Sequence, residues 1–405
     1  MNIRTGIDII KNARIEKIMH KNKDSFYNRI FTADEKDYIE DKNNNVATVA
    51  GMFAAKEAVS KLIGTGIGQV SWKDIIIRHD LYGRPYLELS SIAKNITNKL
   101  GIYNIDISIS NEEEYSVALA IGGQTKIMII ADNMPYRLKK RTQESHKGDY
   151  GRIGIIGGSV GMLGAMYLSS YGALRSGTGL VYAILQKDLA RDLNIKGTEL
   201  ITKEADELSV YRKAQDGLDS LVIGPGFGTG NRQREIVEDC ILNFKNPIVL
   251  DADALNILAT NREILKNRKY KTIITPHPGE MSRLFNTSID EIQNKRESYA
   301  KRFSNEYGGI TILKGHHTIV TDGERLYTNH TGNPGMATGG SGDVLAGIIG
   351  SFLTQFKDPF EACVLAVYVH GLAGDIARDK KGEYGMISTD IIDALPEAIS
   401  YIVEN

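Results

Sequence analysis

The first part of the chain alternates short apolar stretches with polar residues, which is typical of a small α+β unit. Up to about Gly123, the stretches "GIDII", "IIIRH", "YLELS", "DISIS" and "SVALAIGG" have the length and composition of strands, and they surround two or three helical stretches. In "GIDII" a period of two residues places Asp8 on one face and Ile7 and Ile9 on the other. We expect residues 1–122 to fold as one unit.

The second part has a different pattern, in which strand-length apolar stretches alternate with helical segments. The apolar stretches are "RIGIIGG", "LVYAIL", "SLVIGPG", "PIVLDAD", "KTIITP" and "GITILKG". Strands that are apolar along their whole length are buried on both faces, as in parallel sheets. We therefore predict that residues 148–405 form an α/β domain with a mostly parallel sheet covered by helices on both faces. Residues 123–147 end in the basic, polar text "NMPYRLKKRTQESHK" and are predicted to be a linker.

Length, charge and cysteine content limit the classes of function. A chain of 405 residues is long enough for two domains, and its 49 basic and 50 acidic residues nearly cancel, so neither nucleic acid nor an anionic membrane is expected as a partner. Cys240 and Cys363 lack CxxC spacing, which argues against a disulfide framework or a zinc site. The start, "MNIRTGIDII", has no signal-peptide pattern, and no later run approaches the roughly 18 apolar residues of a membrane span. We expect a cytoplasmic protein.

Glycines and polar residues follow several strands of the second part. They occur in "IIGGSVGMLGA", "VIGPGFG", "VLDADALN" and "TPHPGE". Because ligands of open α/β sheets bind at the carboxyl ends of the strands, these turns are expected to line one crevice. In "GGSGDVLAGIIGSFL" the glycines let the backbone approach a phosphate, and the helix that follows directs its free N–H groups toward it.

Asp343 of "GGSGD" is predicted to lie in the first turn of that helix. There the positive end of the helix dipole favours the ionised carboxylate, which can accept a proton from a hydroxyl that attacks phosphorus. Aspartate is also a common helix cap, and the position taken alone favours this purely structural role.

The motifs of the second part resemble those of the ribokinase-like NAD(P)H-hydrate dehydratases. The resemblance rests on "IIGGSVGMLGAMYLSSYGALRSGTG", "LDADALN", "TPHPGEMSRL", "ILKGHHTIV" and "GGSGDVLAG", in the order of that family, from about Lys147 to the end. It implies that ADP donates a phosphate to a hydrated NADH or NADPH, which then loses water to restore the normal cofactor. Phosphorylation converts hydroxide, a poor leaving group, into a good one.

The resemblance also implies roles for single residues. Four of them would face the hydrated nicotinamide, with Asp343 as the general base: Ala165, Gly228, His277 and Asp343. Six of them would hold the nucleotide: Lys314, Gly315, His316, His317, Thr318 and Gly342. Asp251, Asp253 and Glu280 are candidates for positioning magnesium or water, and they are equally compatible with satisfied strand-end carboxylates. His370, in the apolar run "CVLAVYVHGLAG", is predicted to be a packed core histidine.

Two other functions compete for the second part. A dehydrogenase is disfavoured, because the glycines of "IIGGSVGMLG" do not have GxGxxG spacing and no acidic residue follows at the end of a second strand. A vitamin kinase of the same fold is the alternative, since the glycine-rich turn and its aspartate would serve phosphorylation of a small alcohol equally well.

In the first part, "FAAKEAVSKLIGTG" is predicted to be a helix that ends at glycines. Helical spacing places Phe53, Lys56, Glu57 and Lys61 on one face. An amphipathic surface helix with a Glu57–Lys61 ion pair would show the same spacing.

The first part resembles holo-(acyl-carrier-protein) synthase, a phosphopantetheinyl transferase. The motifs "GIDII", "RIFTADE", "AGMFAAKEAVSKLIGTGIG", "GRPYLEL" and "ISISNEEEYSVALA" follow the order of that family. The resemblance implies Mg²⁺-dependent transfer of phosphopantetheine from coenzyme A to a serine of a carrier protein. It assigns Asp8 and Glu57 to the metal, Lys61 to the leaving phosphate as a catalytic residue, and Phe53, Lys56 and Lys61 to coenzyme A.

Two further features concern this transfer. The segment "ARIEKIMHKNK" would place Arg14, Lys17 and Lys21 along one helical stripe beside Ile15, Ile18 and Met19, which suits docking of an acidic acyl carrier protein as well as a solvated surface. Asn111 occupies the place where the family usually has histidine, and Asp34, Glu35 or metal-bound water are the possible proton acceptors.

The sequence therefore predicts a bifunctional enzyme, a phosphopantetheinyl transferase joined to an ADP-dependent NAD(P)H-hydrate dehydratase. Its expected ligands are Mg²⁺, coenzyme A, ADP and hydrated NADH or NADPH, and the resemblance to both families implies a homo-oligomer. The alternative is a vitamin kinase whose N-terminal part is a non-catalytic oligomerising module.

Overall fold

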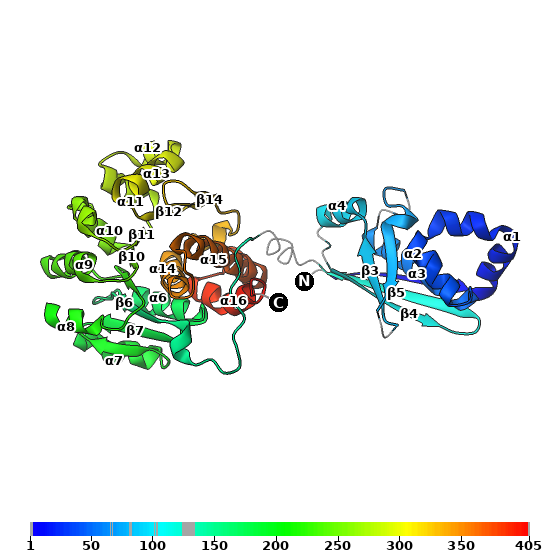
Figure 1. Ribbon diagram of the computed structural model, residues 1–405, viewed down its shortest axis with the longest axis horizontal. Coiled ribbons are helices and arrows are strands. Elements are labelled where there is room, and N and C mark those ends of the chain that lie inside the picture. The colour runs from blue at the N-terminus through cyan, green and yellow to red at the C-terminus, as the bar shows by residue number, and fades with distance from the viewer. Residues whose placement is uncertain are drawn as a thin grey trace. The chain divides into compact units, whose positions relative to one another are not determined.

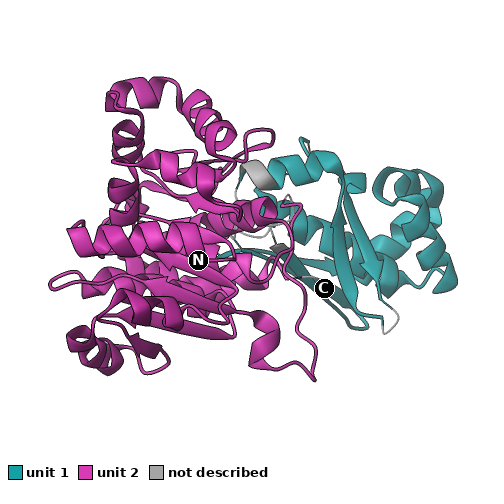
Figure 2. Ribbon diagram, turned by 60° about the vertical axis from the view of Figure 1, so that its left-hand side comes forward, with its two compact units in different colours: residues 1–133 teal, residues 134–405 magenta. Residues whose placement is uncertain are grey.

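The chain folds into two compact units, residues 1–133 and 134–405, called here the N-terminal and C-terminal units (Figure 2). The computed structural model describes residues 3–403 apart from 65, 67, 81, 82, 101, 103 and 124–133. Of the expected linker, residues 124–133 lie outside the described residues, and residues 134–147 belong to the C-terminal unit. There the Leu138 N–H donates to the Ile402 carbonyl at 2.9 Å.

The N-terminal unit is built on an antiparallel three-stranded sheet with the strand order β1–β5–β4 (Figure 1). Its strands and those of a separate hairpin are β1 (Ile3–Lys11), β4 (Asn104–Asn111), β5 (Tyr115–Gly123), β2 (Ile75–His79) and β3 (Pro85–Leu89). Its helices are α1 (Asn12–Ile30), α2 (Ala33–Asp41), α3 (Val46–Ile63), the 3₁₀ turn η1 (Trp72–Asp74) and α4 (Ser91–Lys99).

The alternation along β1 determines which face of this sheet is covered. Gly6 and Ile10 are buried, whereas Ile7 and Ile9 are 60% and 62% exposed, as the period of two predicts. Helix α3 packs against the buried face so closely that a Cβ atom on Gly6 would lie 2.0 Å from the Ala58 carbonyl oxygen. The sheet thus has one face in the core and one apolar face that the unit itself leaves open.

The C-terminal unit contains a nine-stranded sheet with the order β14–β13–β12–β11–β10–β9–β6–β7–β8 (Figure 1). All neighbouring strands are parallel except for the pairs β12–β13 and β13–β14. The strands are β6 (Arg152–Ile156), β7 (Leu180–Leu185), β8 (Ile201–Glu204), β9 (Ser220–Ile223), β10 (Ile248–Leu250), β11 (Thr272–Ile274), β12 (Ile310–Leu313), β13 (Ile319–Thr321) and β14 (Leu326–Thr328). The predicted α/β architecture is confirmed.

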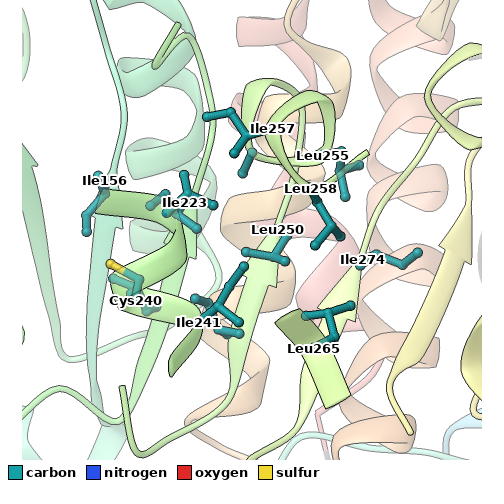
Figure 3. Packing of buried hydrophobic residues seen from close by; sticks show 14 of the residues in the cluster. Ile156, Ile223, Cys240, Ile241, Leu250, Leu255, Ile257, Leu258, Leu265 and Ile274 are labelled. Carbon is teal, nitrogen blue, oxygen red and sulfur yellow. The ribbon is translucent and has the colours of Figure 1, made fainter. Parts of the chain in front are cut away.

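Two groups of helices flank this sheet. The first packs together and consists of α6 (Leu163–Arg175), α14 (Ser341–Leu353), α15 (Pro359–Lys381) and α16 (Ser388–Ser400). The others are α7 (Lys187–Lys196), α8 (Leu208–Ala214), α9 (Asn231–Asn243), α10 (Asp253–Leu258), α11 (Pro278–Phe285), α12 (Ile289–Asn294), α13 (Arg296–Tyr307) and the 3₁₀ turns η2 (Lys147–Tyr150), η3 (Arg262–Asn267) and η4 (Pro334–Met336). Figure 3 shows side chains of β9 and β10 meeting those of α9 and α10 in one apolar cluster.

Helices α6 and α14 touch backbone to backbone. A Cβ atom on Gly347 would lie 1.9 Å from the Ser169 carbonyl oxygen, and one on Gly172 would lie 2.6 Å from the Val344 carbonyl oxygen. Only glycine fits at these two positions, because even a methyl group would overlap the facing backbone.

Helix α15 differs from the expectation that no segment is long and apolar enough for a membrane span. An 18-residue window of α15 reaches a mean hydropathy of 1.4, but 94% of that window is buried inside the C-terminal unit. The helix therefore has the burial of a core helix, and His370 is among its buried residues, as predicted.

Arg268 satisfies carbonyl groups at the C-terminal end of α9. Its Nη1 donates to the Ile241 and Phe244 carbonyls at 2.9 and 2.7 Å, and its Nη2 donates to the Asn246 carbonyl at 2.6 Å. Arg268→Ala is expected to lower the free energy of unfolding by about 1–3 kcal/mol, because the carbonyls of the buried residues Ile241 and Phe244 lose a charged donor. Thermal unfolding checks this; the exposed Lys269→Ala serves as control, and an equal melting temperature for both variants would contradict the role.

Candidate functional site

The turns that follow the strands of the C-terminal unit are joined to one another through the backbone. The Gly224 N–H donates to the Ile156 carbonyl at 3.0 Å, and the Asp251 N–H donates to the Ile223 carbonyl at 3.1 Å. In the same way, the Lys314 N–H donates to the Pro276 carbonyl. The turns after β6, β9, β10, β11 and β12 therefore lie along one edge of the sheet, where the sequence places its glycine and acidic motifs.

Glycines allow these turns to approach one another. A Cβ atom on Gly157 would lie 2.3 Å from the Pro225 carbonyl oxygen. Gly224 has φ +126, and a Cβ atom there would lie 1.8 Å from the Asp251 carbonyl oxygen. Three turns thus lie next to one another: the first glycine-rich turn, the "GPGFG" turn and the "LDADALN" turn. Their backbones approach to distances that a side chain at Gly157 or Gly224 would prevent.

A buried ion pair lies at the centre of this edge. The Lys314 Nζ is 2.7 Å from Asp251 Oδ1 and 4.0 Å from Glu280 Oε2. Asp251 has a side chain that is only 1% exposed, and it also accepts a hydrogen bond from Thr275 Oγ1 at 2.6 Å. Burial alone would lower the pKa of Lys314, but the charges of Asp251 and Glu280 raise it overall, so its ammonium remains positive.

Asp343 is the third residue of α14, whose N-cap is Gly340. Among the described residues, none donates a hydrogen bond to the Asp343 carboxylate, so the carboxylate does not cap the helix. Burial, followed by the charge of Asp251, raises the pKa of Asp343 to about 7. The expectation that the helix dipole keeps this carboxylate ionised is therefore wrong in direction, since burial and neighbouring carboxylates outweigh the dipole.

Gly342 and Lys314, both expected to hold nucleotide, are in contact. A Cβ atom on Gly342 would lie 3.3 Å from the Lys314 Nζ, so the start of α14 and the end of β12 meet at the lysine ammonium. An anion bound at this point could contact both the Lys314 ammonium group and the free N–H groups at the start of α14.

His277 is the N-cap of α11. Its Nδ1 accepts from the Gly279 N–H at 3.0 Å, and its own N–H donates to Glu280 Oε2 at 2.8 Å. An accepting Nδ1 carries no proton, so the neutral ring has its proton on Nε2. Partial burial and the Lys314 charge lower the pKa of His277, and burial raises the pKa of Glu280 to about 7. Both groups therefore favour their neutral forms.

Gly228 and Ala165 lie near the turns that follow β9 and β6. The Gly228 N–H donates to Asp253 Oδ2 at 2.7 Å, and Gly228 has φ +85 with open space where a side chain would be. A Cβ atom on Gly226 would lie 3.1 Å from the Ala165 Cβ, which brings the first helix of the unit next to the same turn.

The segment from Gly315 to Thr318 forms the exposed turn between β12 and β13. Thr318 Oγ1 donates to the Gly315 carbonyl at 2.9 Å, and His317 has a left-handed φ of +55. The rings of His316 and His317 stack with their centroids 3.9 Å apart, and the His330 ring contacts His317 at 4.9 Å. The turn starts at Lys314, which also contacts Gly342. All six residues expected to hold the nucleotide therefore lie in this turn or next to its first residue.

In the N-terminal unit, Asp8 and Lys61 form an ion pair. The Lys61 Nζ is 2.7 Å from Asp8 Oδ1 and donates to the Ile7 carbonyl at 3.0 Å. Burial and the nearby Asp8 charge raise the pKa of Glu57, whereas Lys61 acts in the opposite direction. The two expected metal ligands and Lys61 therefore share one site, in which the ammonium group already occupies a position for a cation.

Lys56 does not share the exposed position of Lys61. Its side chain is fully buried, 2.8 Å from Glu35 Oε1, and its Nζ also donates to the Trp72 and Ile75 carbonyls at 2.9 and 2.5 Å. The predicted single face of α3 is therefore wrong at Lys56, whose ammonium group is already satisfied in the interior. Phe53, the other expected coenzyme A contact, packs against Trp72 with ring centroids 5.2 Å apart.

The basic stripe of α1 also differs from its prediction. Arg14 and Lys17 line a surface depression of about 390 Å³. Ile15, expected beside them as an exposed apolar anchor, is 1% exposed and belongs to the core, and the helix is kinked at Asn22. The charged residues of the predicted docking stripe are therefore exposed, and its accessible apolar part consists of the half-buried Ile18 and Met19.

The structure also places Glu35, a possible proton acceptor for transfer, and Asn111, the departure from the family's usual histidine. Glu35 is 2% exposed, and its carboxylate accepts hydrogen bonds from Lys56 and from the Ile77 N–H at 2.8 Å. Asn111 lies against α3, where a Cβ atom on Gly51 would be 2.6 Å from its Oδ1. Glu35 is thus an interior counter-ion rather than an accessible base.

A family model for NAD(P)H-hydrate dehydratase matches residues 153–397, which is more than half of the chain. The chain belongs to this family. A second model, for the 4'-phosphopantetheinyl transferase superfamily, matches residues 4–120. The chain thus combines two enzyme families, as the sequence predicts.

Relatives of the dehydratase family support this assignment. The ADP-dependent (S)-NAD(P)H-hydrate dehydratase of Neisseria meningitidis is 38% identical over 266 residues, which are 64% of this chain and 88% of that protein. The bifunctional NAD(P)H-hydrate repair enzyme Nnr of Escherichia coli is 39% identical over 281 residues, 69% of this chain and 53% of that enzyme. The chain therefore spans about half the length of the bifunctional repair enzymes that it matches.

A solved dehydratase structure shares the fold of the C-terminal unit. The ADP/ATP-dependent NAD(P)H-hydrate dehydratase of Bacillus subtilis, co-crystallised with ATP and Mg²⁺, is 30% identical and superposes with a TM-score of 0.58 over 66% of this chain and 98% of that chain. A ribokinase-like superfamily protein of Enterococcus faecalis gives a TM-score of 0.62 at 28% identity, over 69% of this chain and 95% of that one.

Sequence reasoning missed two residues at the edge of the dehydratase sheet. Thr275 donates to Asp251, and Asn256 contacts Asp253 through its Nδ2 at 3.4 Å. Both lie inside motifs that the sequence singles out, directly after β11 and within α10. Their place in these motifs was the available signal, but the partner of Thr275 comes from the neighbouring strand end at Asp251, which the sequence does not pair with it.

Proposed function

We propose that the C-terminal unit dehydrates hydrated NADH and NADPH with ADP as the phosphate donor. The observation that carries this proposal is Asp343, whose carboxylate accepts no hydrogen bond from the described residues and interacts electrostatically with the Lys314–Asp251 pair in a site of the dehydratase family. Its pKa of about 7 suits a group that must take up a proton at neutral pH and release it afterwards.

Each residue then has a defined task. Asp343 accepts the proton of the substrate hydroxyl as the hydroxyl oxygen attacks the terminal phosphorus of ADP, and AMP leaves. Lys314 neutralises charge on the transferred phosphoryl group, with the helix start at Gly342 beside it. The electron pair of the ring nitrogen expels phosphate, and loss of a ring proton restores the dihydropyridine. The turns at Ala165, Gly228 and His277 position the nicotinamide.

Recovery of NADH absorbance from hydrated NADH tests this function. The full-length protein is expected to restore the absorbance in the presence of ADP, with ATP as a second donor in a parallel assay, and not without nucleotide. Turnover of a thiazole or pyrimidine alcohol in place of hydrated NADH would contradict the proposal and favour the vitamin kinase, which needs the same glycine-rich turn and aspartate.

For the N-terminal unit, we propose Mg²⁺-dependent transfer of 4'-phosphopantetheine from coenzyme A to a serine of an acidic acyl carrier protein. Asp8 and Glu57 fit a hard cation, because the Asp8 carboxylate and the Ile7 carbonyl both accept the Lys61 ammonium, and the charges of Asp8 and Lys61 both act on Glu57. Mg²⁺ bound there would neutralise the pyrophosphate of coenzyme A. Lys61 steadies the leaving phosphate and Phe53 contacts coenzyme A, whereas Lys56 supports α3 from the interior.

Asp8→Ala is expected to abolish this transfer, because the variant loses a metal ligand and leaves Lys61 without its counter-ion. The measurement is the mass gain of an apo carrier protein incubated with coenzyme A and Mg²⁺, and the exposed Asp24→Ala is the matched control. If the unaltered protein adds no mass where a control synthase does, the N-terminal unit is a non-catalytic module. Transfer by Asp8→Ala at the normal rate would remove Asp8 from the metal site.

We also propose a homo-oligomer that covers the open face of the β1–β5–β4 sheet with a second copy. Ile7 and Ile9 on β1 and Ile121 on β5 are 60%, 62% and 43% exposed and lie on this face. Ile9→Lys is expected to lower the mass measured by light scattering. Ile195→Lys, at an exposed isoleucine of α7, is the control, and an unchanged mass for Ile9→Lys would contradict assembly through the sheet.

A further inference from the structure

The turn between β10 and α10 contains a strained residue. Ala252 has φ +47 and ψ −114, a conformation that residues with a side chain rarely adopt. It lies between Asp251 and Asp253, in the two-residue turn that separates the end of β10 at Leu250 from the start of α10 at Asp253. The two carboxylates on either side of it can therefore point to different parts of the site.

The two carboxylates have separate sets of partners. Asp251 contacts Lys314 and Thr275. Asp253 instead accepts the Gly228 N–H at 2.7 Å on Oδ2, and its Oδ1 is 3.4 Å from Asn256 Nδ2. The strained turn thus directs one aspartate to the charged centre and the other to the "GPGFG" turn.

A chain of polar contacts continues from Asp253 to α11. Asn256 accepts on its Oδ1 a hydrogen bond from Arg283 Nε at 2.9 Å. Arg283 belongs to α11, which starts directly after its N-cap His277. The contacts Arg283–Asn256–Asp253–Gly228 therefore connect the His277 turn to the Gly228 turn, the two turns on which the nicotinamide is proposed to rest.

We infer that Asp253 is a positioning residue for the hydrated nicotinamide, which acts by holding the Gly228 turn through its N–H. This inference rests on the proposed dehydratase function. Nothing lies within 4 Å of the place where a side chain of Gly228 would begin, so the Gly228 backbone is accessible to a substrate, and a shift of this backbone would change the substrate contact. Asp253 does not contact the reacting atoms, and its loss therefore affects substrate binding more than the chemical step.

Three variants of the full-length protein test the inference. Asp253→Ala removes the acceptor of the Gly228 N–H, Asp253→Asn keeps an oxygen acceptor without the charge, and the exposed Asp290→Ala is the matched control. The readouts are KM and kcat for hydrated NADH and the hydrogen exchange of the peptide that contains Gly228. Asp253→Ala is expected to raise KM about tenfold, as for the loss of one hydrogen bond to a charged group, with little change in kcat and faster exchange. Asp253→Asn is expected to bring both the KM for hydrated NADH and the exchange rate of the Gly228 peptide most of the way back to those of the unaltered protein.

The outcomes separate this inference from the proposed function. If the unaltered protein does not restore NADH, the dehydratase function fails, and the inference falls with it even if the exchange of Gly228 responds to Asp253→Ala. If the unaltered protein is active, an unchanged KM in Asp253→Ala overturns the inference. A rise in KM without faster Gly228 exchange, or an equal rise in Asp253→Ala and Asp253→Asn, also overturns it, because the hydrogen bond would then not be the cause.

Discussion

Asp343→Asn is expected to abolish dehydration of hydrated NADH while ADP still binds. Asparagine has nearly the shape of aspartate but cannot accept the proton of the attacking hydroxyl. Lys314 and Gly342, which contact each other at the expected phosphate position, are unchanged in the variant. Initial rates of NADH recovery and calorimetric titration with ADP measure the two effects separately.

The same variant is expected to be more stable than the unaltered protein above neutral pH. The pKa of Asp343 is raised from 3.8 to about 7, so its folded state favours the neutral acid. The stability associated with this group is fully present below about pH 4 and is lost as the pH rises through 7. Asparagine stays neutral, so at pH 8 the free energy of unfolding of the variant should exceed that of the unaltered protein by on the order of 1–3 kcal/mol. The gap in melting temperature between variant and unaltered protein should widen from pH 5 to pH 8.

Asp192→Asn, at an exposed carboxylate of α7, is the control for both measurements. It should change neither the rate nor the melting temperature. Near-normal dehydration by Asp343→Asn would show that another group accepts the proton. A lower melting temperature at pH 8 would show that the Asp343 carboxylate stabilises the fold, contrary to its raised pKa.

Lys314→Met is expected to remove ADP binding and to destabilise the C-terminal unit by about 3–5 kcal/mol. The substitution leaves Asp251, whose side chain is 1% exposed, with Thr275 as its remaining side-chain partner among the described residues. It also removes the positive charge that opposes the carboxylates of Asp343 and Glu280. Thermal unfolding and ADP titration provide the two readouts.

A double variant distinguishes the two roles of Lys314. Lys314→Met combined with Asp251→Asn removes both charges of the buried pair, and most of the lost stability should return. ADP binding should not return, because the charge that faces the phosphate is still missing. Recovery of ADP binding in the double variant would show that Lys314 serves Asp251 rather than the nucleotide.

The fold was predictable because its patterns are local. Continuous apolar stretches identify the strands of the parallel sheet, and strand ends in such a sheet share one edge whatever the details of packing. Alternation in "GIDII" likewise gave the buried and exposed faces of β1, with Ile7 and Ile9 outside. The turns that contain Gly228, His277 and Lys314 could be grouped by this argument alone.

The burial and the pKa of charged side chains depend on partners from other elements, which the spacing of residues along the sequence does not reveal. Lys56 has the helical spacing of a residue on the Glu57 and Lys61 face, but Glu35 of α2 draws it into the core. Asp343 was correctly placed in the first turn of α14, yet its raised pKa follows from burial and then from Asp251, which belongs to another strand end. Periodicity assigns a residue to a helix face, and only the tertiary fold determines what that face meets.

The direct contact between α6 and α14 affects how this fold can accept new substrates. Gly172 and Gly347 leave no room between the two helices for sliding or for a larger side chain. The first glycine-rich turn and the "GGSGD" turn, which precede these helices, should therefore move as a single rigid body when ligands bind. Evolution toward a bulkier alcohol or a different nucleotide would then have to alter the loops after β10, β11 and β12, which this contact does not restrain.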